Sequence, residues 1–372
     1  MTVGVLKELS DESRVSLLPE AVAQITKKEI TVLVENEAGE RACASNADYE
    51  KAGAKIGNDQ QLIASSDIIL SIHKPNPQHS IPHSKILIGI YQPLFDADLM
   101  KKWALQRLTS FSLDMLPRTT RAQSMDVLSS QANIAGYKAV LLAANIYSRY
   151  FPMFMTAAGT IAPAKVLILG AGVAGLQAIA TARRLGAVVE VFDTRPAVKE
   201  EVISLGARFI EVEGAADPSQ AGGYAVEQTE EYKQRQQQRI AESIAKSDIV
   251  ITTAQIPGKK APQLITQQMI EQMRNGSIIV DIAAATGGNT PFTKINENVV
   301  HAGVTIIGNG NLPATMPFDA SKLYGKNVLN FLQLIINKEG EINLDWNDDL
   351  IKGCCITHNG EIVNDRVKSI IQ

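Results

Sequence analysis

The stretch KVLILGAGVAG, residues 165–175, decides the fold of this chain. An apolar run ends in three glycines with the spacing G-x-G-x-x-G, and a helical pattern follows. In a parallel α/β sheet the first glycine permits a tight turn, the second lets the backbone approach a pyrophosphate, and the third lets helix and strand pack closely. The N–H groups at the start of the helix add positive potential. The dinucleotide contacts predicted in this loop are Gly170, Ala171, Gly172, Val173 and Gly175.

The next apolar run, VVEVFD, ends in Asp193, 18 residues beyond Gly175. An acid near this distance accepts a hydrogen bond from a ribose 2′-hydroxyl and repels a 2′-phosphate, so the pattern favours NAD(H) over NADP(H). Thr194 and Arg195 follow directly and are candidate contacts for the adenosine end, although an ordinary exposed arginine fits Arg195 equally well. A flavin site, a Rossmann fold without a nucleotide, and a glycine turn without function are the alternatives.

Short apolar runs alternate with helical patterns in both halves of the chain, which is typical of parallel sheets covered by helices. The runs are residues 2–7, 30–35, 67–72, 86–91, 165–170, 188–193, 208–212, 248–253, 277–282 and 304–308. At roughly 150 residues per domain, a length of 372 residues predicts two domains. We expect an α/β protein with two Rossmann-like domains: a discontinuous one, residues 1–128 with 318–372, and an NAD(H)-binding one, residues 129–317.

Two long helices are expected to join these domains, with a cleft between the domains. Thr120 and Gln123 have the T-x-x-Q spacing of a capping box, which predicts that the first long helix begins there. Residues 321–338 carry apolar side chains at helical spacing and predict the second. The stretch CCITHNGEIV, residues 354–363, predicts two short strands around an Asn-Gly turn that return to the first domain.

Residues 213–239 combine Gly, Ala and Pro with a polar, glutamine-rich run and offer few apolar side chains to a core. One interpretation is a solvated surface loop that runs into a polar helix. The other is a mobile lid, in which Tyr224 is the one large side chain able to close on a ligand.

Composition excludes several classes of protein. A formal net charge of −3 gives no support for nucleic-acid binding, and the three cysteines do not have metal-ligand spacing, so no metal site is expected. The N-terminus has no apolar segment typical of a signal peptide. The 17 uncharged residues from 166 to 182 contain the glycine turn, so we expect no membrane-spanning segment and no direct membrane insertion.

Five further motifs carry a resemblance to a known family. They are KELSDESRVSLLPE (7–20), RAQSMDVLSSQANIAGYKAV (121–140), AGGYA (221–225), TTAQIPGKKAP (252–262) and DIAAATGGN (281–289). Together they closely resemble domain I of the proton-translocating transhydrogenases, over essentially the whole chain. Alanine dehydrogenases share several of these motifs and are the nearest competing family.

The resemblance implies which residues hold the nicotinamide half of NAD(H). Arg118, Gln123 and Asp126 match the family's catalytic Arg-Gln-Asp loop, and a guanidinium, an amide and a carboxylate can together fix the ring for transfer. Gln123 also fits a simple helix cap, and Arg118 with Asp126 also fits a structural ion pair. The family adds Tyr224 of the lid as a catalytic residue. The further cofactor contacts implied by the resemblance are Ser129, Gly223, Gln236 and Gln255.

Two departures from the alanine dehydrogenases concern proton transfer. An amino-acid dehydrogenase needs a general acid/base, and that family uses a histidine and an aspartate where this chain has Gln92 and Ala285. Its carboxylate-binding cations correspond to Arg14 and Lys74, which are present here. Direct hydride transfer between two nicotinamides needs only alignment of the rings, so the missing acid and base favour a transhydrogenase. An amino-acid dehydrogenase and a non-catalytic NAD sensor remain the alternatives.

The resemblance also implies partners. NADP(H) would be bound by a separate subunit, and membrane-spanning subunits would couple hydride transfer to proton translocation. The family's domain I is a homodimer, which we expect here. The chain would be cytoplasmic and peripherally associated with the inner membrane through its partner subunits.

Overall fold

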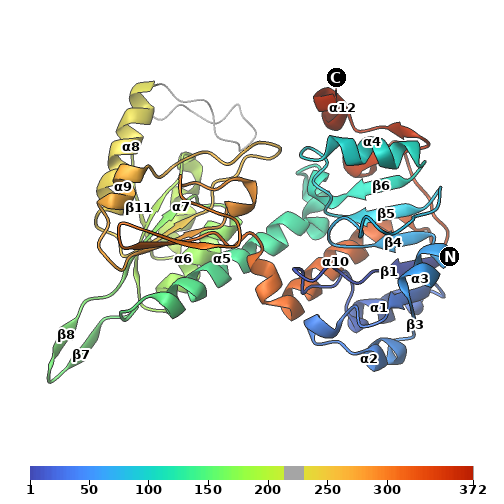
Figure 1. Ribbon diagram of the computed structural model, residues 1–372, viewed down its shortest axis with the longest axis horizontal. Helices are drawn as coiled ribbons and strands as arrows, with labels where there is room; N and C mark the ends of the chain where they lie inside the picture. Colours follow the sequence, from blue (N-terminus) through green and yellow to red (C-terminus); the bar gives the residue numbers. More distant parts are fainter. Residues whose placement is uncertain (213–229, 372) are drawn as a thin grey trace. The chain divides into compact units, whose positions relative to one another are not determined.

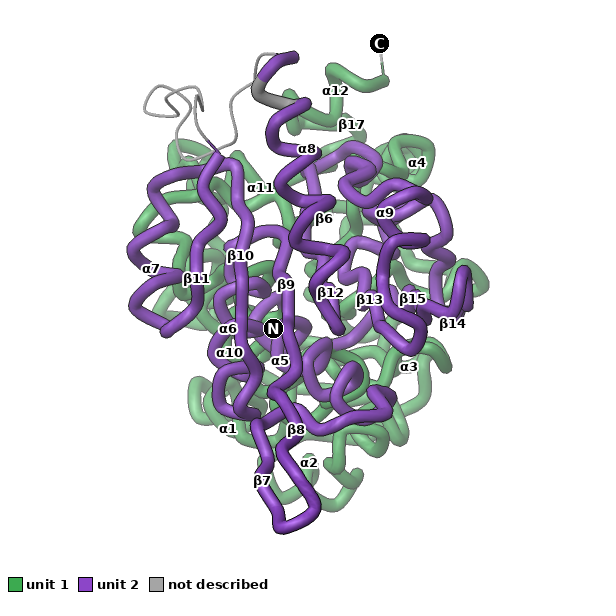
Figure 2. Tube along the Cα trace, turned by 90° about the vertical axis from the view of Figure 1, so that its left-hand side faces the viewer, with its two compact units in different colours: residues 1–131, 313–372 green, residues 132–312 purple. Residues whose placement is uncertain are grey.

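The computed structural model describes residues 1–212 and 230–371, which form two compact units (Figures 1 and 2). Unit 1 comprises Met1–Gln131 with Pro313–Gln372, and unit 2 comprises Ala132–Leu312. These boundaries lie a few residues from the ones expected after 128 and 317. The helix α5 (Val127–Ile146) begins in unit 1 and ends in unit 2.

The second long helix, α10 (Pro317–Ile335), lies in unit 1, as the expected domain bounds placed it. The chain returns to unit 1 at the 3-10 turn Leu312–Thr315, directly before this helix. Pro317 stands at the start of α10, where a missing N–H costs nothing and the fixed φ suits the helix.

Unit 1 contains an eight-stranded sheet in the order β17-β16-β6-β5-β4-β1-β2-β3. The strands are β1 (Thr2–Val5), β2 (Thr31–Glu35), β3 (Lys55–Gly57), β4 (Ile68–Leu70), β5 (Ile86–Gly89), β6 (Thr109–Ser112), β16 (Cys355–His358) and β17 (Glu361–Ile362). The first six are parallel, and β16 joins β6 in antiparallel fashion. The hairpin β16–β17 turns at Asn359 and Gly360, which both have positive φ, and this confirms the predicted turn.

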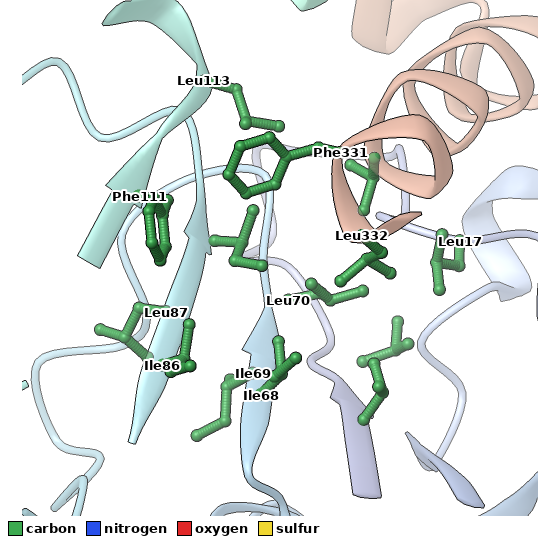
Figure 3. Close-up of a cluster of buried hydrophobic side chains, with 14 of the residues drawn as sticks. Leu17, Ile68, Ile69, Leu70, Ile86, Leu87, Phe111, Leu113, Phe331 and Leu332 are labelled. Carbon is green, nitrogen blue, oxygen red and sulfur yellow. The ribbon is translucent and has the colours of Figure 1, made fainter. Parts of the chain in front are cut away.

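The core of unit 1 lies between this sheet and α10 (Figure 3). Phe111 of β6 meets Phe331 of α10 with ring centroids 5.3 Å apart. The apolar face predicted for the helix is buried: Val328, Leu329, Phe331, Leu332 and Ile335. The other helices of unit 1 are α1 (Pro19–Thr26), α2 (Asn46–Lys51), α3 (Asp59–Ser65), α4 (Ala97–Leu105), α11 (Asp349–Cys354) and α12 (Asp365–Ile371).

Unit 2 contains a seven-stranded sheet in the order β11-β10-β9-β12-β13-β15-β14, parallel except for β14. The strands are β9 (Lys165–Leu169), β10 (Val188–Phe192), β11 (Arg208–Phe209), β12 (Ile249–Thr252), β13 (Ile278–Asp281), β14 (Asn298–His301) and β15 (Val304–Ile307). The helices are α6 (Val173–Arg184), α7 (Lys199–Ser204), α8 (Glu230–Ile244) and α9 (Gln267–Glu271). Strand order reverses at β9, because β10 and β11 lie on one side and β12 on the other. Ligands of open α/β sheets bind at the carboxyl ends of strands at such a point.

One segment of unit 2 lies away from this sheet. A separate hairpin of β7 (Phe154–Thr156) and β8 (Gly159–Ile161) projects from the unit, and all six of its strand residues are exposed (Figure 1). The end of the predicted lid, from residue 230 onward, is the start of α8. Residues 213–229, including Gly223 and Tyr224, lie outside the described residues. No helix in the part of the chain that the structure describes is long and apolar enough to cross a membrane.

Candidate functional site

The glycine loop after β9 has no space for side chains at two of its three glycines. Gly170 has a φ of +104°, and a Cβ there would stand 2.3 Å from Oγ1 of Thr253. A Cβ on Gly175 would stand 1.9 Å from the carbonyl oxygen of Gly170. The first glycine therefore makes the turn and the third lets α6 pack against it, as the pattern predicts.

Gly172 differs from the other two glycines. A Cβ built there meets no heavy atom within 4 Å, so open space lies beside it. Gly172 is the N-cap of α6, and Val173, the first residue of that helix, is exposed. The first N–H groups of a helix have no partner within the helix and bind anions readily. Open space at this glycine, at the point where strand order reverses, fits the pyrophosphate of a dinucleotide.

The carboxylate of Asp193, directly after β10, stands beside this loop. Its Oδ2 accepts a hydrogen bond from the backbone N–H of Ala171 at 2.7 Å. Arg195 donates its backbone N–H to Oδ1 at 2.8 Å and forms an ion pair with the carboxylate through its guanidinium. The loop and the acid that the sequence placed 18 residues apart thus contact each other, with half-buried Thr194 between Asp193 and Arg195.

The loop after β12 is held by residues that sequence reasoning did not single out. Asn289 is fully buried, and its side-chain amide donates to the carbonyls of Ala254 and Pro262 at 2.9 and 2.8 Å. Its backbone N–H donates to the buried carboxylate of Asp281 at 2.6 Å. Gln255, an implied cofactor contact, lies between those two carbonyls in sequence and is exposed. The motif DIAAATGGN contains both Asp281 and Asn289. Only the fold shows that the side chain of Asn289 donates hydrogen bonds to the loop after β12.

The implied nicotinamide residues of unit 1 lie on and before α5. The capping-box prediction is wrong: Thr120–Met125 form a 3-10 turn, and the α-helix begins at Val127. Asp126 takes the capping role, because its carboxylate accepts bonds from the backbone N–H and the hydroxyl of Ser129 at 2.9 and 2.5 Å. Arg118 and Gln123 are exposed. Asp126 and Ser129 are therefore together, and Gln123 belongs to the turn before the helix.

A buried polar cluster in unit 1 was not predicted. Arg14 and Glu12, which are 4% and 1% exposed, form an ion pair at 2.6 Å. Arg14 also donates to the side-chain oxygen of Gln131 at 2.7 Å, and Nε2 of His73 lies 2.8 Å from Glu12. Glu12 and His73 are 61 positions apart, so no sequence spacing could show the contact.

Two further charged residues of unit 1, Lys74 and Glu8, interact with neighbouring groups. Lys74 forms an ion pair with Asp96 at 2.5 Å, so both cations that match the alanine dehydrogenases are paired with carboxylates here. Burial raises the pKa of Glu8 to about 7, against the opposing hydrogen bond from the backbone of Ile72.

Gln236, another implied cofactor contact, is a half-buried residue of α8 in unit 2.

In the glycine loop, a side chain has no room at Gly170 or Gly175 but has open space at Gly172, and Asp193 contacts the loop. These features define a nucleotide-binding protein of the Rossmann class. Residues 4–135 match the family model of the alanine dehydrogenase/PNT N-terminal domain, and residues 139–365 match that of the C-terminal domain. The chain therefore belongs to the alanine dehydrogenase/PNT family.

Individual relatives lie closer to one branch of this family. The chain is 43% identical to a Rickettsia prowazekii protein named as the first part of NAD(P) transhydrogenase subunit alpha, covering 98% of this chain and 96% of the relative. The crystal structure of a transhydrogenase from Sinorhizobium meliloti matches with a TM-score of 0.90 and 42% identity, covering 98% of this chain and all of that one. An alanine dehydrogenase of Staphylococcus epidermidis is 27% identical over 99% of this chain and 96% of its own length. These matches confirm the predicted resemblance and the fold of two Rossmann-like domains.

Proposed function

We propose that this chain is the NAD(H)-binding component of a proton-translocating nicotinamide nucleotide transhydrogenase. The observation that carries the proposal is the open space at Gly172, between two glycines that are sterically closed, at the point where strand order reverses. The similarity to transhydrogenase alpha subunits supports the reaction class. When bound, NAD(H) supplies a nicotinamide ring that gives or takes a hydride.

The residues of the chain bind and orient the cofactor in this proposal. The first turn of α6 holds the pyrophosphate, and Asp193 accepts the ribose hydroxyls. Arg118, Gln123 and Asp126 hold the nicotinamide half, together with Ser129, Gln255, Gln236 and the lid residues Gly223 and Tyr224. Gln92 and Ala285 provide no proton donor or acceptor, and the transfer between two nicotinamides requires none.

The partner subunits in this proposal bind NADP(H), span the membrane and couple the transfer to proton movement. In this proposal the chain is cytoplasmic and associates with the inner membrane only through these partner subunits.

The expected homodimer has a candidate contact in the hairpin β7–β8. A two-stranded hairpin is marginally stable by itself, and here Tyr150 and Phe154 stack at 5.1 Å while Met155 is 70% exposed. We infer that a second copy of this chain covers the hairpin.

The test is to mix the purified chain with a recombinant NADP(H)-binding transhydrogenase subunit and follow reduction of an NAD⁺ analogue by NADPH. We expect turnover with both proteins present and none with this chain alone. The same preparation is assayed for NAD⁺ reduction with L-alanine, which should be negligible. Appreciable alanine oxidation would establish an amino-acid dehydrogenase, and NADH binding without either activity would establish a sensor.

A further inference from the structure

The carboxylate of Asp193 is fully engaged within unit 2. Its Oδ1 accepts from the backbone N–H and from Nε of Arg195, at 2.8 and 3.0 Å. Its Oδ2 accepts from the backbone N–H of Ala171 and from Nη2 of Arg195, at 2.7 and 2.9 Å. A carboxylate offers about four acceptor positions, so these four bonds use its capacity. The side chain of Asp193 is only 6% exposed, so solvent reaches little of it.

Two of these four bonds can be exchanged more easily than the others. The backbone donors Ala171 and Arg195 belong to the loops that build the site, and moving them would disturb the turn at Gly170. The guanidinium bonds come from a side chain that is 29% exposed and can rotate without moving the backbone. A ribose with two neighbouring hydroxyls needs two acceptor positions, which is the number that the guanidinium occupies.

We propose that in the free protein the guanidinium of Arg195 occupies the positions on Asp193 that the ribose hydroxyls of NAD(H) take, and that binding exchanges one set of donors for the other. This rests on the proposed dinucleotide site. The displaced guanidinium has a second acid nearby, since Glu201 of α7 already attracts it electrostatically. The exchange therefore moves the positive charge from one acid toward another.

The exchange has two opposite effects on cofactor binding. The apparent affinity for NADH is the intrinsic affinity multiplied by the fraction of molecules in which Asp193 is not bound by the guanidinium of Arg195. It is therefore lower than the intrinsic affinity. A guanidinium displaced to the edge of the ribose site also attracts a 2′-phosphate, which softens the rejection of NADPH by Asp193. Removal of the Arg195 side chain should therefore tighten NADH binding and weaken NADPH binding. A residue with a merely structural role would not move the two affinities in opposite directions.

The test is a calorimetric titration of the full chain with NADH and with NADPH. The variants are Arg195→Ala and Arg195→Met, the second keeping an apolar side chain of similar length. The matched control is Arg208→Ala, which removes one positive charge from an exposed pair with Glu190 in the same sheet. We expect both Arg195 variants to bind NADH about three- to tenfold more tightly, as the loss of a partly buried ion pair implies, and NADPH more weakly. The control should match the wild type.

Weaker or unchanged NADH binding in both Arg195 variants, with unchanged melting temperatures, would overturn the exchange. A structure of the wild-type chain with NADH gives a readout that needs no variant. There, Nε and Nη2 of Arg195 should no longer contact Asp193, and persistence of both contacts would also overturn the proposal. If the wild-type chain binds no NADH, the proposed function fails with it, whereas binding without tightening in the variants removes only the exchange.

Discussion

The three glycines of the loop allow a prediction in which stability and binding respond separately. In Gly175→Ala the new methyl group would stand 1.9 Å from the carbonyl oxygen of Gly170, while ordinary contact begins near 3.4 Å. The obstacle is backbone, so the turn or the start of α6 must move by more than an ångström. We take the upper part of the range for overpacked sites, about 3 kcal/mol of destabilisation. For a unit of this size, that lowers the melting temperature by roughly 6–12 °C.

Gly172→Ala is the matched control for this change. Its methyl group meets nothing within 4 Å, and its φ of −78° suits alanine. The loss of a favourable N-cap and the gain in chain stiffness should leave stability within about 0.5 kcal/mol of the wild type. The methyl group would instead fill the space assigned to the pyrophosphate, so NADH binding should weaken by about tenfold or more.

Scanning calorimetry and NADH titration of both variants check this reasoning. A Gly175→Ala protein that melts like the wild type would show that the loop relaxes freely and that close packing is not the role of this glycine. A Gly172→Ala protein with normal NADH affinity would show that the pyrophosphate lies elsewhere.

Three further predictions use other residues. Asp193→Ala should weaken NADH binding by about 1–3 kcal/mol, because the ribose hydroxyls lose their acceptor, and should relax the rejection of NADPH. Equal affinities of variant and wild type for NADH in calorimetry would refute the assignment of Asp193 to the ribose. Burial raises the pKa of Glu8 to about 7 from an ordinary 4.5, so its contribution to stability is complete below pH 4.5 and is lost as the pH rises to about 7. Urea unfolding at pH 5 and pH 8 should therefore show a loss of up to about 3 kcal/mol in the wild type that is absent in Glu8→Gln; the same loss in both would place the proton elsewhere. Replacing residues 154–161 by a short Gly-Ser turn should convert a dimer into a monomer in analytical ultracentrifugation, and a dimer that survives would exclude the hairpin as the contact.

The local patterns of the sequence predicted the parts of the fold that depend on neighbours along the chain. Apolar runs located β9, β10, β12, β13 and β15, because strands covered on both faces by helices are nearly continuous in apolar residues. The spacing of Gly170, Gly172 and Gly175 predicted a tight turn and close helix packing, because both follow from backbone sterics over a few residues. Short strands without an apolar run, such as Lys55–Gly57 and Thr109–Ser112, gave no such signal.

Only the tertiary structure decided which distant side chains meet. The helix α5 was predicted to begin at Thr120, but in the structure Asp126 caps its first turn and residues 120–125 form a 3-10 turn. The contacts of Glu12 with His73 and of Arg14 with Gln131 join residues that are 61 and 117 positions apart in sequence. Asp193 was visible as an acid at the right distance from the glycines, but its engagement by Arg195 was not. Hydrogen bonds and burial depend on positions in space, and those positions follow from the sequence only through the whole fold.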